Sequence, residues 1–247
     1  MGRISNVAIL IDGGFYKQRF KKKHGKYPSK YNVKTLITDI INQIKKKSGE
    51  DSEDILFRSY YYDCLPFDKV IKHPDGSQID FGESKLFNSQ TKFINSLTEI
   101  DQMALRLGEL SFNGWRLSPY HPKGDPSPDF RQKGVDMKIG LDMAWMASRD
   151  TIHKIVLVAG DSDFVSPMKL VRREGILIYI YPMGNKIKAE FKEHSDFILN
   201  DSDMTKKNKK NSAKNNRRLK IEGTLDDVLK VSTQKNEKET IKDDKAN

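Results

Sequence analysis

The stretch Lys154-Ile-Val-Leu-Val-Ala-Gly-Asp-Ser-Asp-Phe164 decides the fold that this chain is expected to adopt. Residues 155 to 159 form a continuous apolar run without polar alternation. Such a run is typical of a strand that is buried on both faces, as in the middle of a parallel sheet. Gly160 ends the run, and Asp161 and Asp163 follow it directly. In open α/β sheets ligands bind beyond the carboxyl ends of the strands, so both acids are expected at such a site.

Two acids this close raise the question of a bound cation. At a separation of about 4 Å and an effective dielectric of about 20, two carboxylates repel each other by ~4 kcal/mol, and a divalent cation would relieve this repulsion. The alternative is that Asp161 caps the turn and Asp163 is solvated, and the stretch alone leaves both interpretations open. Beyond it, Ser166 and Pro167 predict the N-cap and first turn of a helix that extends to about Arg173.

The composition excludes several classes of protein. The 247 residues, 36% hydrophobic and 32% charged, are enough for a sizeable core with a polar periphery. No apolar run approaches the roughly 18 residues of a membrane span, and the first residues lack the apolar region of a signal peptide. The single cysteine, Cys64, excludes an intrachain disulfide, and the five histidines show no metal-ligand spacing, which argues against zinc. We therefore expect a cytoplasmic protein without a membrane association.

The net charge of +10 is unevenly placed, with +6 over residues 1–200, +6 over 201–220 and −2 over 221–247. Residues 201–220 carry eight Lys or Arg against two Asp, and the segment from Lys206 to Lys220 has almost no apolar residues. We expect a domain over residues 1–200 and a basic, mostly disordered tail over 201–247, with a short helix over 224–231 that would need a protein partner to fold. A basic body with a basic tail indicates a polyanionic partner, with nucleic acid as the first candidate, although lysine-rich surfaces also serve solubility.

Strands and helices are expected to alternate along residues 1–200. The expected strands cover residues 6–12, 55–64, 155–159 and 176–181, a further strand begins at Trp115, and residues 197–199 form a short closing element. The expected helices cover residues 32–48, 84–110, 135–148, 166–173 and 185–194. Residues 16–30 and 119–129 are interpreted as loops, and residues around 73–76 as a hairpin-like turn. This alternation predicts an α/β domain with a parallel sheet.

Further acids stand at the ends of predicted elements. Asp12 ends the strand over 6–12, and Gly13 and Gly14 allow a tight turn behind it. Asp136 lies just inside a helix start, where the helix dipole by itself favours an anion. Asp142 lies six residues later, about 240° round the helix, and does not share the face of Asp136. We therefore assign Asp142 a supporting or structural role. Asp12 and Asp161 meet only if their strands are neighbours in the sheet.

Three motifs carry a resemblance to a known family. They are Ile-Asp-Gly-Gly-Phe15, Phe-Arg-Gln-Lys-Gly-Val-Asp136 running on to Leu-Asp-Met143, and Val-Ala-Gly-Asp-Ser-Asp-Phe164. In this order and spacing they resemble the NYN domain, in its LabA-like branch, of the PIN-like nuclease superfamily. The resemblance covers about residues 5–199, and Tyr60 to Asp63 also resemble that branch.

The resemblance implies a three-layer α/β sandwich with a central, mainly parallel sheet and a cluster of acids at its carboxyl edge. It implies that Asp12, Asp136, Asp161 and Asp163 are both the catalytic and the metal-binding acids. The family is expected to cut RNA, rather than DNA, with Mg²⁺ or Mn²⁺, and oxygen-only ligands suit such hard cations. The implied reaction is hydrolysis of a phosphodiester by metal-activated water, as in an endoribonuclease.

Residues beside these acids are candidates for substrate binding. Arg131 and Lys133 precede Asp136 and are expected to contact a neighbouring phosphate, although an ordinary exposed basic loop is the equal alternative. Ser162, between two of the acids, is assigned to the same role. The chain departs from many NYN domains at Phe15 and Tyr16, where an asparagine often follows the first acid, so a polar contact to substrate or water is in doubt.

Other functions remain as alternatives. The first is a PIN-like module that binds RNA or a protein partner without cutting it. A Toprim-type fold would place a glutamate after its first strand, where this chain has Asp12-Gly-Gly. A haloacid-dehalogenase phosphatase would need an acid at position 14, which is glycine. The chain has no glycine-rich Gly-Lys-Ser/Thr loop of a nucleoside triphosphatase.

Overall fold

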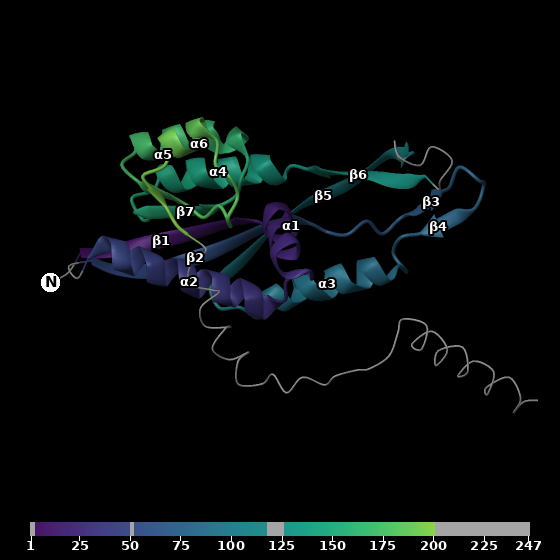
Figure 1. Ribbon diagram of the computed structural model, residues 1–247, viewed down its shortest axis with the longest axis horizontal. Coiled ribbons are helices and arrows are strands. Elements are labelled where there is room, and N and C mark those ends of the chain that lie inside the picture. The colour runs from purple at the N-terminus through teal and green to yellow at the C-terminus, as the bar shows by residue number, and fades with distance from the viewer. Residues whose placement is uncertain (1–2, 50–51, 118–125, 201–247) are drawn as a thin grey trace, which may run out of the picture. The chain divides into compact units, whose positions relative to one another are not determined.

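The computed structural model describes residues 3–49, 52–117 and 126–200 (Figure 1). Its centre is a seven-stranded sheet in the order β6-β5-β2-β1-β7-β8-β9, and β3 and β4 form a separate two-stranded sheet. Neighbouring strands of the large sheet are parallel except β5 and β6, which pair antiparallel. The strands are β1 (Arg3–Asp12), β2 (Ser52–Cys64), β3 (Val70–Lys72), β4 (Gln78–Asp80), β5 (Met103–Arg116), β6 (Ser127–Lys133), β7 (Lys154–Val158), β8 (Leu177–Ile180) and β9 (Phe197–Ile198).

Helices cover both faces of the sheet, as Figure 1 shows. One buried core lies beneath α1 (Gly13–His24), α2 (Lys30–Ser48) and α3 (Lys85–Leu97). The other lies beneath α4 (Val135–Ala147), α5 (Val165–Arg173) and α6 (Ala189–Glu193). The expected α/β sandwich around a mainly parallel sheet is therefore confirmed. Within these ranges, no helix combines the length and the apolar character that a membrane crossing requires.

The two central strands are buried on both sides. The side chains from Val7 to Ile11 in β1 and from Ile155 to Val158 in β7 are all 0% exposed. Successive side chains of a strand point to opposite faces, so those of β1 enter the two cores alternately. Both faces of these strands are apolar for this reason, and their sequences read as continuous runs.

The loop expected over residues 16–30 was wrong for its first half, which is the helix α1. The helix begins directly after Asp12, whose side chain caps it by accepting a hydrogen bond from the Phe15 backbone N–H at 3.0 Å. Tyr16 and Phe20, one turn apart, are buried with ring centroids 5.8 Å apart. A buried stripe of two aromatic rings among many lysines gives too little helical periodicity to be recognised. Gly25, at φ 70°, ends the helix.

The long helix expected over residues 84–110 was wrong beyond Leu97. Six positions later β5 begins at Met103, and its first half pairs with β2, placing Leu105 opposite Tyr61. The turn between helix and strand includes Gln102 at φ 56°, a conformation that reverses the chain. Pairing with a buried neighbouring strand thus overrides the helical spacing of the apolar residues.

The segment around residues 115–134 also differs from expectation. Trp115 lies near the end of β5 instead of beginning a strand, and β6 occupies residues 127–133, which were expected to be a loop and a lead into a helix. Pro128 is compatible with β6 because this strand is at the edge of the sheet. Residues 118–125 of the expected loop lie outside the described residues. An aromatic cluster holds β5 and β6 against the β3–β4 hairpin, and its members are Phe67, Phe81, Phe112, Trp115 and Phe130.

The turn around residues 73–76 and the helices α5 and α6 agree with the sequence predictions in part. The hairpin-like turn around residues 73–76 is confirmed as the connection between β3 and β4. Helix α5 starts at Val165, so Ser166 lies inside the helix and does not cap it. Helix α6 is shorter than the helix expected over residues 185–194. The tail over residues 201–247, including the helix expected over 224–231, lies outside the described residues.

Candidate functional site

The carboxyl ends of β1 and β7 lie side by side. Ile11 pairs with Val158, and Asp12 and Asp161 follow these positions. A cavity of about 440 Å³ lies at this edge of the sheet. Its wall is formed by Asp12, Gly14, Phe15, Gln18, Gln132, Asp136, Gly160, Asp161 and Asn185. Three of the four predicted acids therefore surround one cavity.

A larger cavity, of about 630 Å³, lies at the opposite edge of the sheet, around His153 and Gly175. Its wall mixes both charges, with Arg149, Asp150 and Glu174 among its residues. It lies at the amino end of β7, whereas ligands of open α/β sheets bind at the carboxyl ends of the strands. We therefore place the candidate site at the smaller cavity.

Asp12 is the most buried acid on the cavity wall, and its environment opposes ionisation. Burial is the main cause that raises the pKa of its carboxyl group, to about 6, and the negative charges of Asp136 and Asp63 contribute in the same direction. Hydrogen bonds from the backbone N–H groups of Phe15 and Gly14 oppose this rise. Ionisation of the Asp12 carboxyl group thus costs free energy, and a nearby positive charge would offset this cost.

Asp136 is placed by the first turn of α4, after Gly134, which adopts φ 79° as the N-cap. Partial burial raises the pKa of the Asp136 carboxyl group, and the negative charges of Asp161 and Asp163 raise it further. The acids from β1, α4 and the segment after β7 therefore act electrostatically on one another across the site.

Asp161 and Asp163 take different positions. Asp161 lines the cavity and accepts a hydrogen bond from the Asp163 backbone N–H at 3.2 Å, which makes it the cap of a short 3-10 helix over Ser162–Phe164. The capping role considered as an alternative is thus present together with the position at the cavity. Asp163 is exposed, contributes its charge to the surroundings of Asp136, and is not on the cavity wall.

The donor chemistry of the cavity fits a hard divalent cation. Its polar side chains end in carboxylates or amides, from Asp12, Asp136, Asp161, Gln18, Gln132 and Asn185. Carboxylate and amide oxygens are the ligands that Mg²⁺ and Mn²⁺ accept. In the described ranges, no group of three or more His, Cys, Asp or Glu side chains is arranged to hold a metal ion. The acids thus share a cavity without forming a complete coordination shell.

The basic residues predicted to contact substrate flank the cavity instead of lining it. Gln132 is on the wall, whereas its neighbours Arg131 and Lys133 in β6 are not. Successive residues of a strand point to opposite sides, which accounts for this difference. Arg131 is exposed and lies 4.0 Å from the carboxylate of Asp129. The two cations were predicted from the sequence, and the amide between them was not.

Two further predicted residues have other partners. Asp142 accepts hydrogen bonds from the Tyr62 hydroxyl at 2.7 Å and from Nε of Arg106 at 2.9 Å. Its carboxylate therefore joins α4 to β2 and β5, which is a structural role away from the cavity. The Ser162 hydroxyl accepts a hydrogen bond from Nζ of Lys188 at 2.9 Å, and Ser162 is not on the cavity wall.

Glycines keep the cavity open. A Cβ atom at Gly160 would come within 2.4 Å of the Phe15 ring, and one at Gly14 would lie 3.3 Å from both an Asp12 oxygen and Oε1 of Gln132. The Phe15 ring thus packs on Gly160 at the wall. Gln18 and Asn185 were not predicted from the sequence, whereas Phe15 stood in one of the motifs beside the Gly13-Gly14 pair.

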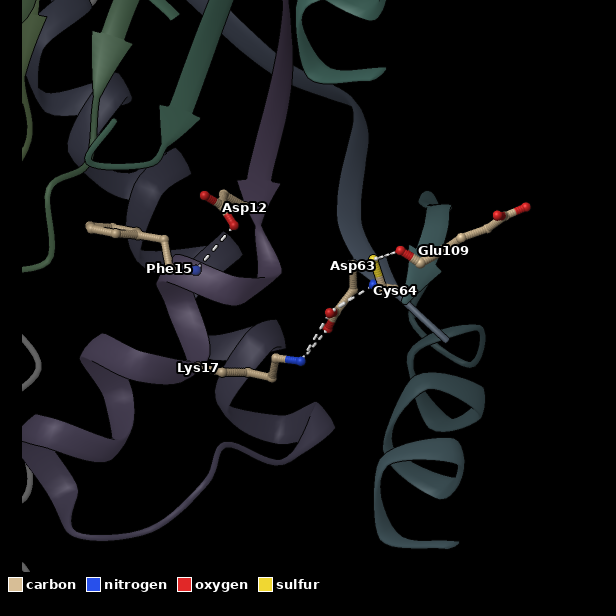
Figure 2. Close-up of polar contacts among 6 residues, drawn as sticks. All are labelled: Asp12, Phe15, Lys17, Asp63, Cys64 and Glu109. Atoms are coloured by element: carbon tan, nitrogen blue, oxygen red, sulfur yellow. Dashed lines mark hydrogen bonds and ion pairs between the residues drawn. The ribbon is translucent and has the colours of Figure 1, made fainter. Parts of the chain in front are cut away.

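A buried ion pair joins α1 to β2, as Figure 2 shows. The Asp63 side chain is 1% exposed, and Nζ of Lys17 lies 2.7 Å from one of its carboxylate oxygens. The other oxygen accepts a hydrogen bond from the Cys64 backbone N–H at 2.9 Å. Cys64 in turn donates from Sγ to the Glu109 carbonyl oxygen at 3.2 Å. These contacts tie α1, β2 and β5 together behind Asp12.

The sequence matches the family model of the NYN domain over residues 6–201, which is most of the chain. The chain belongs to the NYN family. NYN domains are part of the PIN-like nuclease superfamily, are typically nucleases, and generally use divalent metal ions. The acids around the cavity lie within this match.

Other comparisons add little to the NYN assignment. No curated protein sequence matches the chain. Among solved structures, the chain is similar to a protein of unknown function from Vibrio parahaemolyticus, with 14% sequence identity and a TM-score of 0.45. The similarity covers 81% of this chain and 94% of the other.

Proposed function

We propose that this NYN domain is a metal-dependent ribonuclease that hydrolyses phosphodiester bonds within RNA, and that it belongs to the LabA-like branch. The observation that carries the proposal is the cavity at the carboxyl edge of the sheet, with Asp12, Asp136 and Asp161 on its wall. The raised pKa values of Asp12 and Asp136 support it, because carboxylates held together at a cost are stabilised by a bound cation.

The acids, two of the amides and the polar residues that flank the cavity have proposed roles. Asp12, Asp136 and Asp161 would hold Mg²⁺ or Mn²⁺, with Asp163 adding negative charge from the adjacent turn. The ion would supply an activated water and offset the charge that develops on the phosphate. The amides of Gln132 and Asn185 can donate hydrogen bonds to phosphate oxygens or to water at the wall. Arg131, Lys133 and Ser162 at the rim would contact neighbouring nucleotides.

RNA is the proposed substrate in preference to DNA. The net charge of +10 favours a polyanion. The tail over residues 201–247, whose cations lie close together in sequence, would add affinity for the phosphate backbone without reading bases. A cytoplasmic location is part of the same proposal.

A module that binds RNA without cutting it is the second candidate. The observation in its favour is that, within residues 3–49, 52–117 and 126–200, no three acids form a ready coordination group. In this case the raised pKa of Asp12 would reflect burial and the neighbouring negative charges without serving metal binding, and the cavity would hold water.

A cleavage assay separates the two candidates. Labelled single- and double-stranded RNA and DNA would be incubated with the full chain and Mn²⁺, Mg²⁺ or EDTA, and in parallel with Asp161→Asn. The matched control is Asp101→Asn, which removes an exposed acid next to the amino end of β5, at the other edge of the sheet. The proposal expects RNA cleavage that requires metal, survives Asp101→Asn and is lost in Asp161→Asn. Binding without cleavage under every condition would support the second candidate, a module that binds RNA without cutting it.

A further inference from the structure

The outer side of α4 exposes three large apolar side chains in a row. Met137 is 68% exposed, Leu141 61% and Trp145 52%. They are spaced four residues apart and so lie along one side of the helix, while Val135, Ile139, Met143 and Met146 form its buried side. Single exposed apolar residues are common, but three on one side of a helix indicate a surface that contacts another molecule.

Arginines stacked on aromatic rings accompany this row. The Arg149 guanidinium lies over the Trp145 ring, with Cζ 5.6 Å from the centroid. On β2, Arg58 lies over Phe57 at 5.7 Å. Neither Arg58 nor Arg149 forms an ion pair with a carboxylate among the described residues, so both charges remain available to a partner.

Strand β2 lies beside α4, and a second set of contacts connects them. The Tyr62 hydroxyl of β2 and the Arg106 guanidinium of β5 both bond to Asp142 of α4. Arg106 also lies over the Tyr60 ring at 5.1 Å. We define the α4 face as the surface formed by Met137, Leu141, Trp145 and Arg149. Arg58 and the partly buried Phe57 belong to the neighbouring strand β2.

The charge of the α4 face selects among possible occupants. A second copy of the chain would bring unpaired arginines against one another, which opposes association. An anionic partner meets complementary charge. An exposed aromatic ring with a guanidinium group above it is also how unpaired nucleic acid strands are held, by base stacking together with phosphate contacts. A base stacked on Trp145 must be free of its complementary strand, so a duplex does not fit.

The same helix connects this face to the candidate site. Asp136, on the cavity wall, immediately precedes Met137 in the helix. Trp145 lies about 12 Å from Met137 along the helix axis. We propose that the α4 face binds an unpaired segment of the nucleic acid strand, with a base stacked on Trp145 and phosphates on Arg58 and Arg149. The inference rests on the proposed function for its ligand class and adds that the bound strand is single.

The test uses Trp145 as its own reporter. The chain has two tryptophans, so Trp115→Phe leaves Trp145 as the only one, and Asp161→Asn prevents cleavage of the probe. The probes are a 5′-labelled 12-nucleotide RNA without self-complementarity and a blunt duplex of the same RNA. Fluorescence anisotropy of the label gives the dissociation constant, and the emission of Trp145 is followed in the same titration.

The single-stranded RNA is expected to quench Trp145 emission with the same midpoint as the anisotropy change. The duplex is expected to leave Trp145 emission unchanged. Trp145→Ala should weaken binding of the single strand about tenfold, and Trp145→Phe less, because it keeps a ring for stacking. Arg149→Ala and Arg58→Ala should each reduce the salt slope of log affinity by about 0.7. The matched control is Leu86→Ala on α3, 59% exposed on the other face of the sheet, which should leave the affinity unchanged.

Three outcomes would overturn the inference. Binding that Trp145→Ala does not weaken would show that the strand avoids the α4 face, while leaving the proposed function intact. Trp145 emission that shifts with protein concentration in the absence of RNA, together with a monomer after Trp145→Ala, would assign the face to a second copy. Absence of both RNA binding and cleavage by the wild-type chain would reject the proposed function together with the inference.

Discussion

Lys17 of α1 and Asp63 of β2 form an ion pair of 2.7 Å in which the carboxylate is 1% exposed and the lysine side chain 19% exposed. The pair lies behind the turn that carries Asp12, and the charge of Asp63 contributes to the raised pKa of Asp12. The first turns of α1 are thus fixed to the end of β2 at the point where both approach the cavity. Stability and site geometry therefore depend on the same contact.

Removing the cation of this pair should destabilise the fold. Lys17→Met leaves the Asp63 carboxylate buried without a counter-charge, which costs about 3 kcal/mol in the free energy of unfolding. Denaturant unfolding at pH 7 measures this cost. Lys17→Arg, which keeps the charge, should lose much less. Equal stability of Lys17→Met and wild type would mean that Asp63 is solvated or protonated in the folded protein.

Asp161→Asn should abolish cleavage while the fold remains intact. The substitution removes one of the negative charges that raise the pKa of Asp136, so the melting temperature without metal should hold or rise. Thermal unfolding in EDTA and a cleavage assay on the same preparation provide the two readouts. Full cleavage by a preparation free of contaminating nuclease would remove Asp161 from the mechanism. A large fall in the melting temperature would instead indicate that the Asp161 carboxylate has a structural role.

The burial of Asp12 predicts a pH-dependent stability difference. The Asp12 carboxyl group loses its proton near pH 3.8 in the unfolded chain and near pH 6 in the folded chain, so the folded state binds more protons between these values. Stability contributed by this group is therefore present below about pH 4 and is lost as the pH rises to about 6, by ~3 kcal/mol in total. Asp12→Asn does not ionise and should gain about this much over wild type between pH 4 and pH 7. Denaturant unfolding in EDTA at each pH measures the difference, and parallel curves for the two proteins would contradict it.

Metal should stabilise the wild-type chain and not its site variants. A cation that binds only the folded state adds ~2.7 kcal/mol to the free energy of unfolding at a free concentration of about 100 times its dissociation constant. Thermal unfolding across a Mn²⁺ series measures this gain. It should be small in Asp12→Asn and Asp161→Asn and unchanged in Asp101→Asn. A gain of equal size in all four proteins would place the bound ion elsewhere.

Deleting residues 201–247 should weaken RNA binding in a salt-dependent manner. These residues lie outside the described part of the chain, and the prediction rests on the eight cations between Lys206 and Lys220. If half of them contact phosphates of a single strand, the salt slope of log affinity should fall by about 3, at about 0.7 for each contact. Cleavage should survive because no candidate ligand lies beyond residue 200. Equal slopes for the two proteins would mean that the tail does not contact nucleic acid, which leaves the competing idea that it docks a protein through Leu225, Val228 and Leu229.

The parts of the fold that could be predicted are those encoded by neighbouring residues. The apolar runs of β1 and β7 are uninterrupted because both faces are buried, and each run is followed by an acid of the site. Helix α1 could not be predicted in this way. The burial of Tyr16 depends on the Tyr61 ring, 6.5 Å away in a strand that lies 45 positions later. Strand β6 exists only because β5 offers it a partner.

The same distinction applies to the candidate site. Asp12, Asp136 and Asp161 could be predicted because they stand at the ends of recognisable elements. Gln132 and Asn185 could not, since an amide in an edge strand or a loop carries no pattern of its own. Because successive side chains of β6 point to opposite sides, Gln132 lies on the cavity wall and the predicted Arg131 and Lys133 do not.

The order of strands in the sheet has a consequence for synthesis on the ribosome. β1 is made first, but its neighbour β7 pairs with it through Val7 and Lys154, which lie 147 positions apart. At roughly 5–20 residues per second, this interval lasts about 7 to 30 s. During this time β2 can protect one edge of β1, while the other edge keeps its backbone groups unpaired and its apolar side chains only partly covered. The nascent chain is therefore most prone to aggregation before residue 154 emerges, and holdase chaperones should increase its soluble yield at that stage.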